Sequence, residues 1–599
     1  MVKVRDIYPI GQTVAGCDPP ADTPRSSQNV VHATKKRASR AEARRVWSGI
    51  GLIFGSGLYL YFNLFTINGI PYLLDGDQVF FWVYAERLLN GEHIYRDFFQ
   101  FTPPGTDLVF FSLFRLFGPR LWITNWVVLV LGVVLCWLCF RISLLLMSEC
   151  GALLASSMFL VLLFGKMLSA THHWFSVLAV TMAVAVLMKI RSPARIMAAG
   201  ALLGLASFFT QTRGFLVAIG IAVALVFECF NNNEPLGNAI RDILALVFSS
   251  LASWASLSSY LLATMGLRRL LTFQITSAQR YVIHGWTFMS LGIPAEDMTW
   301  KTLHVVSQYM FVYLLLPSVY AICAWECWKS RETLFLSRER VVLLTSTGLA
   351  MMLEVAQSLN WIRVYSVAMP AIILFVMLLH KPARLRAGAG LFTWLCILVL
   401  ALHQINSRYH TQHSVAQLPG GTVATSAAKA EKMEWLARHT RPNQFFFQAG
   451  SPGLYLPLQL RNPVFIDEFD RRGVTPSNYV DSSMRQLDAK GVQYILWSPR
   501  IDSPGPEKDI EDNHLSVFRK YLEKNYRQIH DFSDADQLWE RKPGTPTTPT
   551  PGGLKGPQSD TYIYPRTRVL IWSSGRIPTF QTGISFVCWW QKELANFTH

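Results

Sequence analysis

The stretch that decides the fold is LLDGDQVFFWVYAERLLNGEHIYRDFFQFTPPGTDLVFFSLFRLFG, residues 73–118, which follows the first long apolar run of the chain. Apolar side chains recur in it at helical spacing in two groups: Phe80, Phe81, Tyr84 and Leu88, then Phe110, Phe111, Phe114 and Phe117. The spacing predicts two helices with one apolar face each, the first starting near Asp77 and the second after Pro103-Pro104-Gly105. Six acidic residues accompany three arginines here, so the stretch is polar as well as aromatic.

Apolar runs of membrane-spanning length lie on both sides of this stretch and recur between residues 46 and 404. Only 16% of the 599 residues are charged and 51% are hydrophobic, whereas roughly a quarter of the residues of a soluble protein are charged. This composition excludes a disordered chain and argues against a water-soluble globule. We therefore expect an all-α polytopic membrane protein whose two amphipathic helices lie in the membrane interface.

The apolar runs predict about eleven membrane spans. They lie near residues 46–66, 121–142, 152–165, 172–188, 196–210, 214–229, 243–265, 306–326, 341–358, 363–379 and 388–404. The third, fifth and sixth runs are shorter than the roughly 20 residues that a span needs, so one of them could be re-entrant.

Basic residues gather in the segments that this span count places in the cytoplasm. Six of them, with one acid, lie at residues 35–45 before the first span, and later clusters lie at 189–195, 329–340 and 381–386. Such clusters are typical of cytoplasmic loops, although a net charge of +16 also allows a nucleic-acid-binding arm at the N-terminus. The pattern predicts a cytoplasmic N-terminus. It places three parts outside: residues 69–120, 266–305 and everything after about 405.

Composition divides the chain into four parts. We predict a disordered basic cytoplasmic tail, a membrane domain, a small α/β extracytoplasmic domain, and a linker followed by a tail without an assigned role: residues 1–45, 46–405, 407–542 and 543–599. In the third part, helix-like stretches alternate with strand-like ones: helices at 427–438 and 515–525, and strands at 444–448, 464–466 and 494–497. The linker is rich in Pro, Thr and Gly and cannot form a core.

Asp75 and Asp77 stand at the start of the first predicted helix, at membrane depth on the outer side. An aspartate in this place is ordinarily an N-cap, which accepts hydrogen bonds from free backbone N–H groups. One cap needs one aspartate, and Asp-Gly-Asp could also be a cap with a turn residue. Spacing alone leaves both capping and a catalytic role open.

A longer pattern begins at Asp77. It reads D-(Q/E)-x-x-(F/Y)-x-x-(Y/I)-A-x-x-(L/M)-L-x-G, followed by Y-x-D and a Pro-Pro pair, and is carried by Asp77, Gln78, Phe81, Tyr84, Ala85, Leu88, Leu89, Gly91, Tyr95, Asp97, Pro103 and Pro104. The pattern resembles the GT-C superfamily of membrane glycosyltransferases, and within it the group of protein O-mannosyltransferases, aminoarabinose transferases and rhizobial lipopolysaccharide transferases. The resemblance covers the first two spans and their loop; farther along it rests on topology.

The resemblance implies a GT-C-like fold and a glycosyltransferase. Such an enzyme moves a sugar from a polyprenyl-phosphate donor to a lipid, glycan or protein hydroxyl outside the membrane, and its catalytic acid lies in this loop. A bacterial inner membrane and no nucleic-acid partner are also implied. The motif favours Asp77 over Asp75 as the catalytic aspartate. Many relatives have Glu where this chain has Gln78, and the missing carboxylate weighs against metal assistance here. Aminoarabinose transferases have Lys where this chain has Thr102, so this chain lacks one possible phosphate contact.

Glycosyl transfer from a lipid phosphate needs a base for the acceptor hydroxyl and cations for the departing phosphate. A partly desolvated aspartate can serve as the base, and attack opposite the phosphate predicts inversion. Charges near membrane segments are costly and usually face polar cavities, so the candidate phosphate ligands are Lys166, Arg213 and Arg363. A snorkelling role for Lys166 is the alternative. The candidate substrate-binding residues are Tyr95, Asp97, Gln100, His172 and Glu354, of which Glu354 could instead form a structural ion pair with an arginine.

Cofactors are not indicated. His172 and His173 are neighbours, and adjacent side chains on a helix point about 100° apart, so we expect no metal site. The isolated Pro-Gly and Gly-Gly pairs lack the context of a nucleotide-binding loop. Two other functions stay open: a transporter or flippase of lipid-linked sugars, for which no paired half-repeats are visible, and a non-catalytic relative whose α/β domain binds glycan.

Overall fold

The computed structural model of the protein describes residues 24–189, 191–283, 310–329, 335–356, 361–379, 386–469, 475, 477–501 and 515–544. The beginning of the predicted N-terminal tail, the later part of the predicted outer loop 266–305, and the predicted linker and tail after residue 544 lie outside the described residues.

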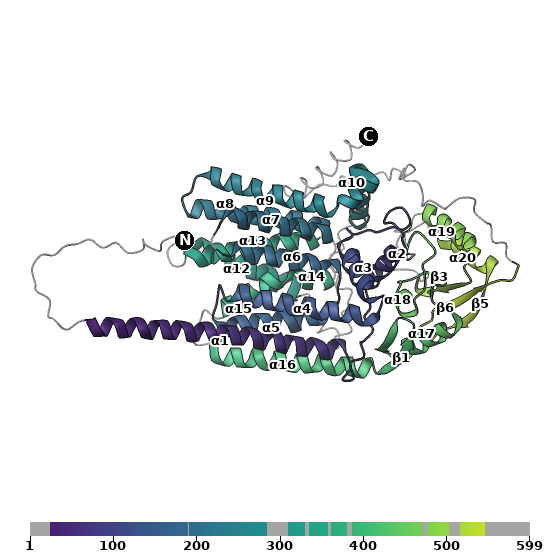
Figure 1. The fold of residues 1–599 in the computed structure, drawn as a ribbon, viewed down its shortest axis with the longest axis horizontal. Helices are drawn as coiled ribbons and strands as arrows, with labels where there is room; N and C mark the ends of the chain where they lie inside the picture. The colour runs from purple at the N-terminus through teal and green to yellow at the C-terminus, as the bar shows by residue number, and fades with distance from the viewer. Residues whose placement is uncertain are drawn as a thin grey trace, which may run out of the picture. The chain divides into compact units, whose positions relative to one another are not determined.

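The described residues up to Thr411 are mostly helical (Figure 1). The helices are α1 (Pro24–Leu64), α2 (Gln78–Leu89), α3 (Gly105–Phe117), α4 (Leu121–Ser143), α5 (Glu149–Met158), α6 (His172–Leu187), α7 (Pro193–Phe209), α8 (Gln211–Asn231), α9 (Leu236–Leu257), α10 (Ser259–Ile283), α12 (Leu316–Lys329), α13 (Phe335–Val355), α14 (Trp361–Val367), α15 (Met369–Leu379) and α16 (Arg386–Thr411). Each predicted span overlaps at least one of them. Among the described residues, five helices are long and apolar enough to cross a membrane: Leu121–Ser143, Glu149–Lys166, Gln211–Asn231, Leu236–Leu257 and Gly390–Thr411.

The structure differs from the predicted boundaries in three places. Helix α1 begins at Pro24, well before the predicted span at residue 46, and residues 24–45 are rich in good helix formers. The seventh predicted span, 243–265, is displaced: α9 starts at Leu236, since the charge of Asp242 is compensated by Arg191 at 2.5 Å. The tenth, 363–379, is split into α14 and α15 just before Pro370, which cannot continue a helix's hydrogen-bond ladder.

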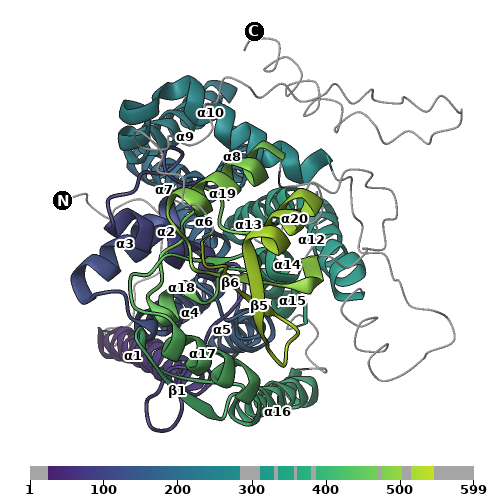
Figure 2. The same ribbon diagram turned by 90° about the vertical axis from the view of Figure 1, so that its right-hand side faces the viewer.

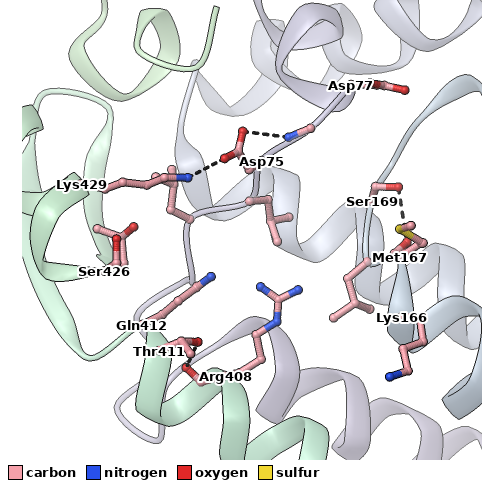
Figure 3. A pocket seen from close by; sticks show the side chains of 15 residues that line it. Asp75, Asp77, Lys166, Met167, Ser169, Arg408, Thr411, Gln412, Ser426 and Lys429 are labelled. Carbon is pink, nitrogen blue, oxygen red and sulfur yellow. Dashed lines mark hydrogen bonds and ion pairs between the residues drawn. The ribbon is translucent and has the colours of Figure 1, made fainter. Parts of the chain in front are cut away.

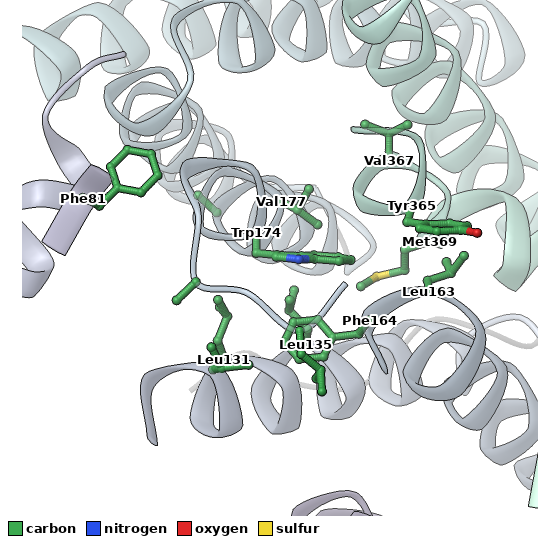
Figure 4. Packing of buried hydrophobic residues seen from close by; sticks show 14 of the residues in the cluster. Phe81, Leu131, Leu135, Leu163, Phe164, Trp174, Val177, Tyr365, Val367 and Met369 are labelled. Carbon is green, nitrogen blue, oxygen red and sulfur yellow. The ribbon is translucent and has the colours of Figure 1, made fainter. Parts of the chain in front are cut away.

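The helices pack closely because small residues allow it. A Cβ atom at Gly200 of α7 would lie 2.0 Å from Ser249 Oγ of α9, and one at Gly204 would lie 2.3 Å from the Ser250 carbonyl. These two glycines, four residues apart, let the two helix backbones touch. Elsewhere aromatic side chains fill the core: Trp174 of α6 lies against Phe164, with ring centroids 4.8 Å apart, beside the leucines of α4 (Figure 4).

Both helices predicted in residues 73–118 are present as α2 and α3. In α3, Phe110 and Phe114 of the predicted apolar face are buried, whereas Phe117, predicted on the same face, is exposed. In α2, however, residues on all sides are buried, including the polar side chain of Arg87. The prediction of a free polar face is wrong for α2, because the C-terminal domain packs on it: Arg87 donates to the Val464 carbonyl at 2.8 Å and to Asp467 at 3.0 Å.

The C-terminal part is a small α/β domain with a mixed sheet, as predicted. Its elements are β1 (Ser414–Leu418), β2 (Gly421–Thr425), α17 (Ala427–His439), β3 (Phe446–Gln448), α18 (Tyr455–Leu458), α19 (Ser477–Ala489), β4 (Tyr494–Trp497), α20 (Leu515–Asn525), β5 (Tyr526–Asp531) and β6 (Gln537–Arg541). Strands β1 and β2 form a hairpin, and the other four form a sheet in the order β3-β4-β6-β5, with β3 and β4 parallel and the remaining pairs antiparallel.

The strand predicted at 464–466 is absent. There the backbone bends, and side chains replace a ladder: the Val464 N–H donates to Asn462 Oδ1 and the Phe465 N–H to Gln486 Oε1. Three consecutive apolar residues predict a buried segment, and Val464, Phe465 and Ile466 are indeed buried, although they do not form a strand.

The β1–β2 hairpin attaches the C-terminal domain to the first loop. The Leu73 N–H donates to the Ala424 carbonyl at 2.8 Å, and the Ala424 N–H donates to the Pro71 carbonyl at 2.9 Å. Asn125 of α4 holds the same loop through the Tyr72 carbonyl at 2.9 Å. Helix α16, which leads into β1, runs beside α1 (Figures 1 and 2). These contacts bring residues that follow Ala424 next to Asp75.

Candidate active site

The loop between α1 and α2 carries both aspartates, and neither caps α2. Asp77 directly precedes the helix, but its side chain makes no capping hydrogen bond. Asp75 Oδ1 accepts a hydrogen bond from its neighbour, the Gly76 N–H, at 2.8 Å. The capping explanation for the Asp-Gly-Asp sequence is therefore wrong for both carboxylates.

A cavity of about 470 Å³ opens beside this loop. Its walls come from the 73–77 loop, from residues 166–169 after α5, and from the chain between Arg408 and Lys429. The polar residues that line it are Asp75, Asp77, Lys166, Ser169, Arg408, Thr411, Gln412, Thr425, Ser426 and Lys429 (Figure 3). The two aspartates thus share one cavity with three cations.

Asp75 forms an ion pair with the C-terminal domain. Lys429 Nζ, from the first turn of α17, lies 2.5 Å from Asp75 Oδ2, and the two side chains are 48% and 60% exposed. Burial opposes ionisation of Asp75, but the hydrogen bond and charge of Lys429 and the Gly76 N–H outweigh it and lower the pKa of Asp75. Asp75 is accordingly held as a carboxylate.

The carboxylate of Asp77 has a different environment from that of Asp75. No residue that the structure describes donates a hydrogen bond to its carboxylate, which lines the cavity. The surrounding protein desolvates the group and raises the pKa of Asp77, although the charge of Arg363 partly opposes this. A carboxylate with unused lone pairs and a raised pKa is suited to accept a proton.

Arg408 and Lys166 supply positive charge from the membrane helices. The Arg408 guanidinium, near the end of α16, points into the cavity, and Lys166 lies at its edge (Figure 3). Neither forms an ion pair or side-chain hydrogen bond with another residue in the described ranges. Gln404, one turn before Arg408, fixes α16 in place: it accepts a hydrogen bond from Tyr59 of α1 and donates to the Val161 carbonyl at 3.1 Å.

Gln78 ties two walls of the cavity together. Its Nε2 donates to the Asp75 carbonyl at 2.9 Å, and its Oε1 accepts from the Ala170 N–H at 3.0 Å. The Gln78 side chain thus both donates and accepts a hydrogen bond. The carboxylate of a Glu could not donate to the Asp75 carbonyl, because it has no N–H. These two contacts account for Gln rather than Glu at this position.

Arg213 and Glu354 lie elsewhere and form a closed pair. Arg213 is fully buried, and its Nη2 lies 2.8 Å from Glu354 Oε2. Its Nη1 donates to the His173 carbonyl and to Ser176 Oγ, each at 2.8 Å. All three guanidinium nitrogens are engaged, since Nε also donates to Glu354. Neither residue lines the cavity.

Arg363 and His172 lie between these two groups. Arg363, on α14, is close enough to Asp77 to act on its charge. His172 is buried with its ring against Phe81 of α2, at 5.6 Å between centroids. The rings of His172 and His173 do not diverge as predicted: their centroids are 3.9 Å apart. Among the described residues, no group of three or more His, Cys, Asp or Glu side chains is arranged to hold a metal ion.

Tyr95, Asp97 and Gln100 lie toward the C-terminal domain and do not line the cavity. Asp97 is engaged by the His93 N–H at 2.8 Å and by Arg96 at 2.7 Å. Gln100 is buried and donates to Asp107 at 2.6 Å. On the same side, burial raises the pKa of Glu86 to about 8.

Two of the three cations in the cavity escaped the sequence analysis. Arg408 follows the last predicted span on the side predicted to be outside, where a basic residue runs against the usual charge bias, so the sequence held a usable signal. Lys429 lies 354 residues from its partner Asp75. No local pattern predicts so distant a contact.

Searches with protein-family models and against the sequences of curated proteins gave no match. Solved structures do resemble the chain. ArnT from Cupriavidus metallidurans bound to undecaprenyl phosphate has a TM-score of 0.52 at 12% identity, over 83% of this chain and 98% of that one. The oligosaccharyltransferase of Archaeoglobus fulgidus in complex with Zn and sulfate has a TM-score of 0.46 at 12% identity, over 82% and 73%. The same organism's AglB with an inhibitory peptide and a dolichol-phosphate also has 0.46, at 12% identity, over 76% and 70%.

The similarity to ArnT extends over nearly the whole of that protein and identifies the architecture. The fold is therefore similar to that of ArnT, in agreement with the GT-C-like fold that the motif in residues 77–104 implies. Together with the apolar helices, it makes the chain a multi-pass membrane protein.

Proposed function

We propose that the protein, a multi-pass membrane protein with the GT-C fold, is a glycosyltransferase. It moves a sugar from a polyprenyl-phosphate donor to a hydroxyl group of a lipid, glycan or protein. The observation that carries this proposal is the cavity that Asp77, without a hydrogen-bond donor among the described residues, shares with the cations Lys166 and Arg408. ArnT, which has a similar fold, binds undecaprenyl phosphate.

The cations suit the donor phosphate. Arg408 and Lys166 lie at the ends of apolar helices, where the head of a membrane-anchored lipid would reach them. A guanidinium can grip phosphate oxygens bidentately and an ammonium adds a point charge. Arg363 is a third candidate because its charge acts on Asp77. Arg213 is a weaker candidate, since Glu354, His173 and Ser176 already occupy its nitrogens.

The chemistry assigned to the site is a single displacement. Asp77 takes the proton of the acceptor hydroxyl, whose oxygen attacks the anomeric carbon. The bond between that carbon and the phosphate oxygen breaks, and its electron pair leaves with the phosphate, which Arg408 and Lys166 stabilise. Attack from the side opposite the phosphate inverts the anomeric configuration. Asp75, paired with Lys429, holds the wall beside the base.

The proposed orientation follows from charge. Basic clusters at 35–45, 189–195, 329–340 and 381–386 favour a cytoplasmic N-terminus. The first loop and the C-terminal domain then lie together outside the membrane, which agrees with their shared cavity. We assign catalysis to the membrane domain 46–405 with a contribution from the domain 407–542, in a bacterial inner membrane.

Asp77→Asn tests the proposal. In a deletion strain that expresses either the wild type or this variant, surface glycans are measured by mass spectrometry. We expect the variant to reach the membrane in normal amount and to lower product formation about 10²- to 10⁴-fold, the contribution of a general base. Asp481→Asn, on the exposed face of α19, is the matched control. Unchanged glycans in Asp77→Asn would contradict a transferase and favour a transporter or a glycan-binding protein.

A further inference from the structure

Lys429 is an unfavourable residue for its position near the N-terminus of α17. It occupies the third position of α17, after the N-cap residue Ser426 and two alanines. In this sequence position a Glu would complete a capping box, and a positive charge at a helix N-terminus opposes the helix dipole. Ser426 also makes no capping hydrogen bond. A residue that breaks the local rules of its helix commonly serves a function.

Stability does not explain its ion pair with Asp75 either. Both side chains are about half exposed, at 48% and 60%, and ion pairs exposed to this extent contribute little to folding. The domain is already attached to the loop by the backbone hydrogen bonds between Ala424 and residues 71 and 73. The pair is therefore not needed to hold the domain in place.

The position of Lys429 does fit a binding role. It lines the same cavity as Lys166 and Arg408, together with Thr425 and Ser426 of the C-terminal domain, and it lies across the cavity from Lys166 (Figure 3). The hairpin contacts through Ala424 fix the backbone five residues before Lys429, next to the start of α17. An ammonium at this place can release Asp75 and turn to an anion that enters the cavity.

We infer that Lys429 and Ser426 of the C-terminal domain form a phosphate subsite in the active-site cavity, and that Asp75 holds Lys429 until the phosphate arrives. This inference rests on the proposed function, because it takes the cavity to be the transfer site. The phosphate belongs either to the lipid-linked donor or to the acceptor. In both cases the C-terminal domain is part of the binding site rather than an appendage.

The inference predicts that substitutions of the two ion-pair partners change the affinity for phosphate in opposite directions. Lys429→Gln removes a ligand and leaves the charge of Asp75 facing the phosphate, so binding weakens. Asp75→Asn releases Lys429 toward the phosphate, so binding strengthens or stays equal. The double variant binds better than Lys429→Gln alone, because the unpaired carboxylate is gone. A purely structural pair would give losses of the same sign for both single variants.

The test uses the full chain in phosphatidylcholine nanodiscs with undecaprenyl phosphate as the probe, titrated by microscale thermophoresis. Lys429→Gln is expected to weaken binding about three- to tenfold, the loss of one half-exposed charged contact. Lys429→Arg should retain most of the affinity, and Lys520→Gln on the exposed face of α20 should match the wild type. The melting temperature of each variant reports whether it is folded.

A second titration separates the two sources of phosphate. Inorganic phosphate is added to protein saturated with undecaprenyl phosphate. If Lys429→Gln weakens the lipid's binding, the subsite takes the donor phosphate; if it weakens only the second titration, it takes a phosphate of the acceptor. If neither titration changes, or if Asp75→Asn weakens binding as Lys429→Gln does, the inference is wrong. Should the wild type not bind undecaprenyl phosphate, the proposed donor class fails, and inorganic phosphate alone still tests Lys429.

Discussion

Two groups of charged side chains lie among the helices, and they differ in how completely the protein satisfies them. In the closed group, Arg213 is fully buried and each of its nitrogens has a partner, with Glu354 accepting two of the bonds. In the open group, Arg408 and Lys166 face a cavity and form no ion pair within the described residues. Both groups have charges near apolar helices, so membrane depth alone does not mark a functional charge. What distinguishes them is the partner. Arg213 and Glu354 pair with each other and stabilise the fold, whereas Arg408 and Lys166 have no such partner among the described residues and are the proposed ligands of the phosphate.

The largest effect is expected in the closed group. Arg213→Ala leaves Glu354 buried without its cation, and breaking a buried pair in this way costs about 3–5 kcal/mol. The expected result is a large drop in melting temperature and in the yield of folded protein, measured by fluorescence-detected size-exclusion chromatography. Replacing both residues together, as Arg213→Leu with Glu354→Leu, should recover most of the loss. A well-folded Arg213→Ala protein that has lost donor binding would instead place Arg213 in the open group.

Glu86, on α2, should make stability depend on pH. Burial raises its pKa from 4.5 to about 8, so between these values the folded protein keeps a proton that the unfolded chain has released. Stability therefore falls as pH rises from about 5 to about 8, by about 1–2 kcal/mol once partial access of water is allowed for. Thermal unfolding across this range should show a flatter profile for Glu86→Gln. Parallel profiles for the two proteins would contradict the assignment.

Substitutions in the open group should affect binding and leave folding intact. Arg408→Gln and Lys166→Gln are each expected to raise the KM for the donor about tenfold, or about 1.4 kcal/mol, through loss of one charged contact. Their melting temperatures should equal that of the wild type. Arg438→Gln, an exposed arginine at the end of α17, is the control. A lowered melting temperature without a change in KM would move either residue into the closed group.

Arg363 offers the smallest and most specific test, because its charge opposes the upward shift in the pKa of Asp77. Removing this charge in Arg363→Gln should raise that pKa further. Since the base must be ionised, the acidic limb of the activity profile moves to higher pH, by about half a unit to one unit. Activity measured between pH 4 and pH 8, relative to each variant's own maximum, reports the shift independently of any loss in donor affinity. Lys166→Gln serves as the comparison.

The fold was predictable to a large extent because its signals are local. Apolar runs of sufficient length predicted the helices, and aromatic spacing predicted α2 and α3. Errors arose where a distant partner alters the local rule. Asp242 lies inside α9 because Arg191 neutralises it, and α2 is buried on all sides because Asp467 and Val464 meet its Arg87.

The candidate site was predictable only in its first part. Asp75, Asp77 and Lys166 were identified from the loop motif and from their place beside apolar runs. Arg408 and Lys429 were missed, and Arg213 was preferred to Lys166 as a phosphate ligand, because a sequence lists charges without showing which of them meet. The capping explanation for the aspartates also required coordinates to be rejected, since it depends on where two carboxylates point.

The sequence by itself determined that the chain is a membrane protein with a polar loop led by aspartates, since hydrophobic length and residue spacing are properties of neighbouring residues. Only the tertiary structure decided which charges are neutralised and which remain open to a ligand. Burial and hydrogen bonding depend on partners that lie far along the chain: 141 residues separate Arg213 from Glu354, and 354 separate Asp75 from Lys429. The ionisation and reactivity of a side chain follow from those partners.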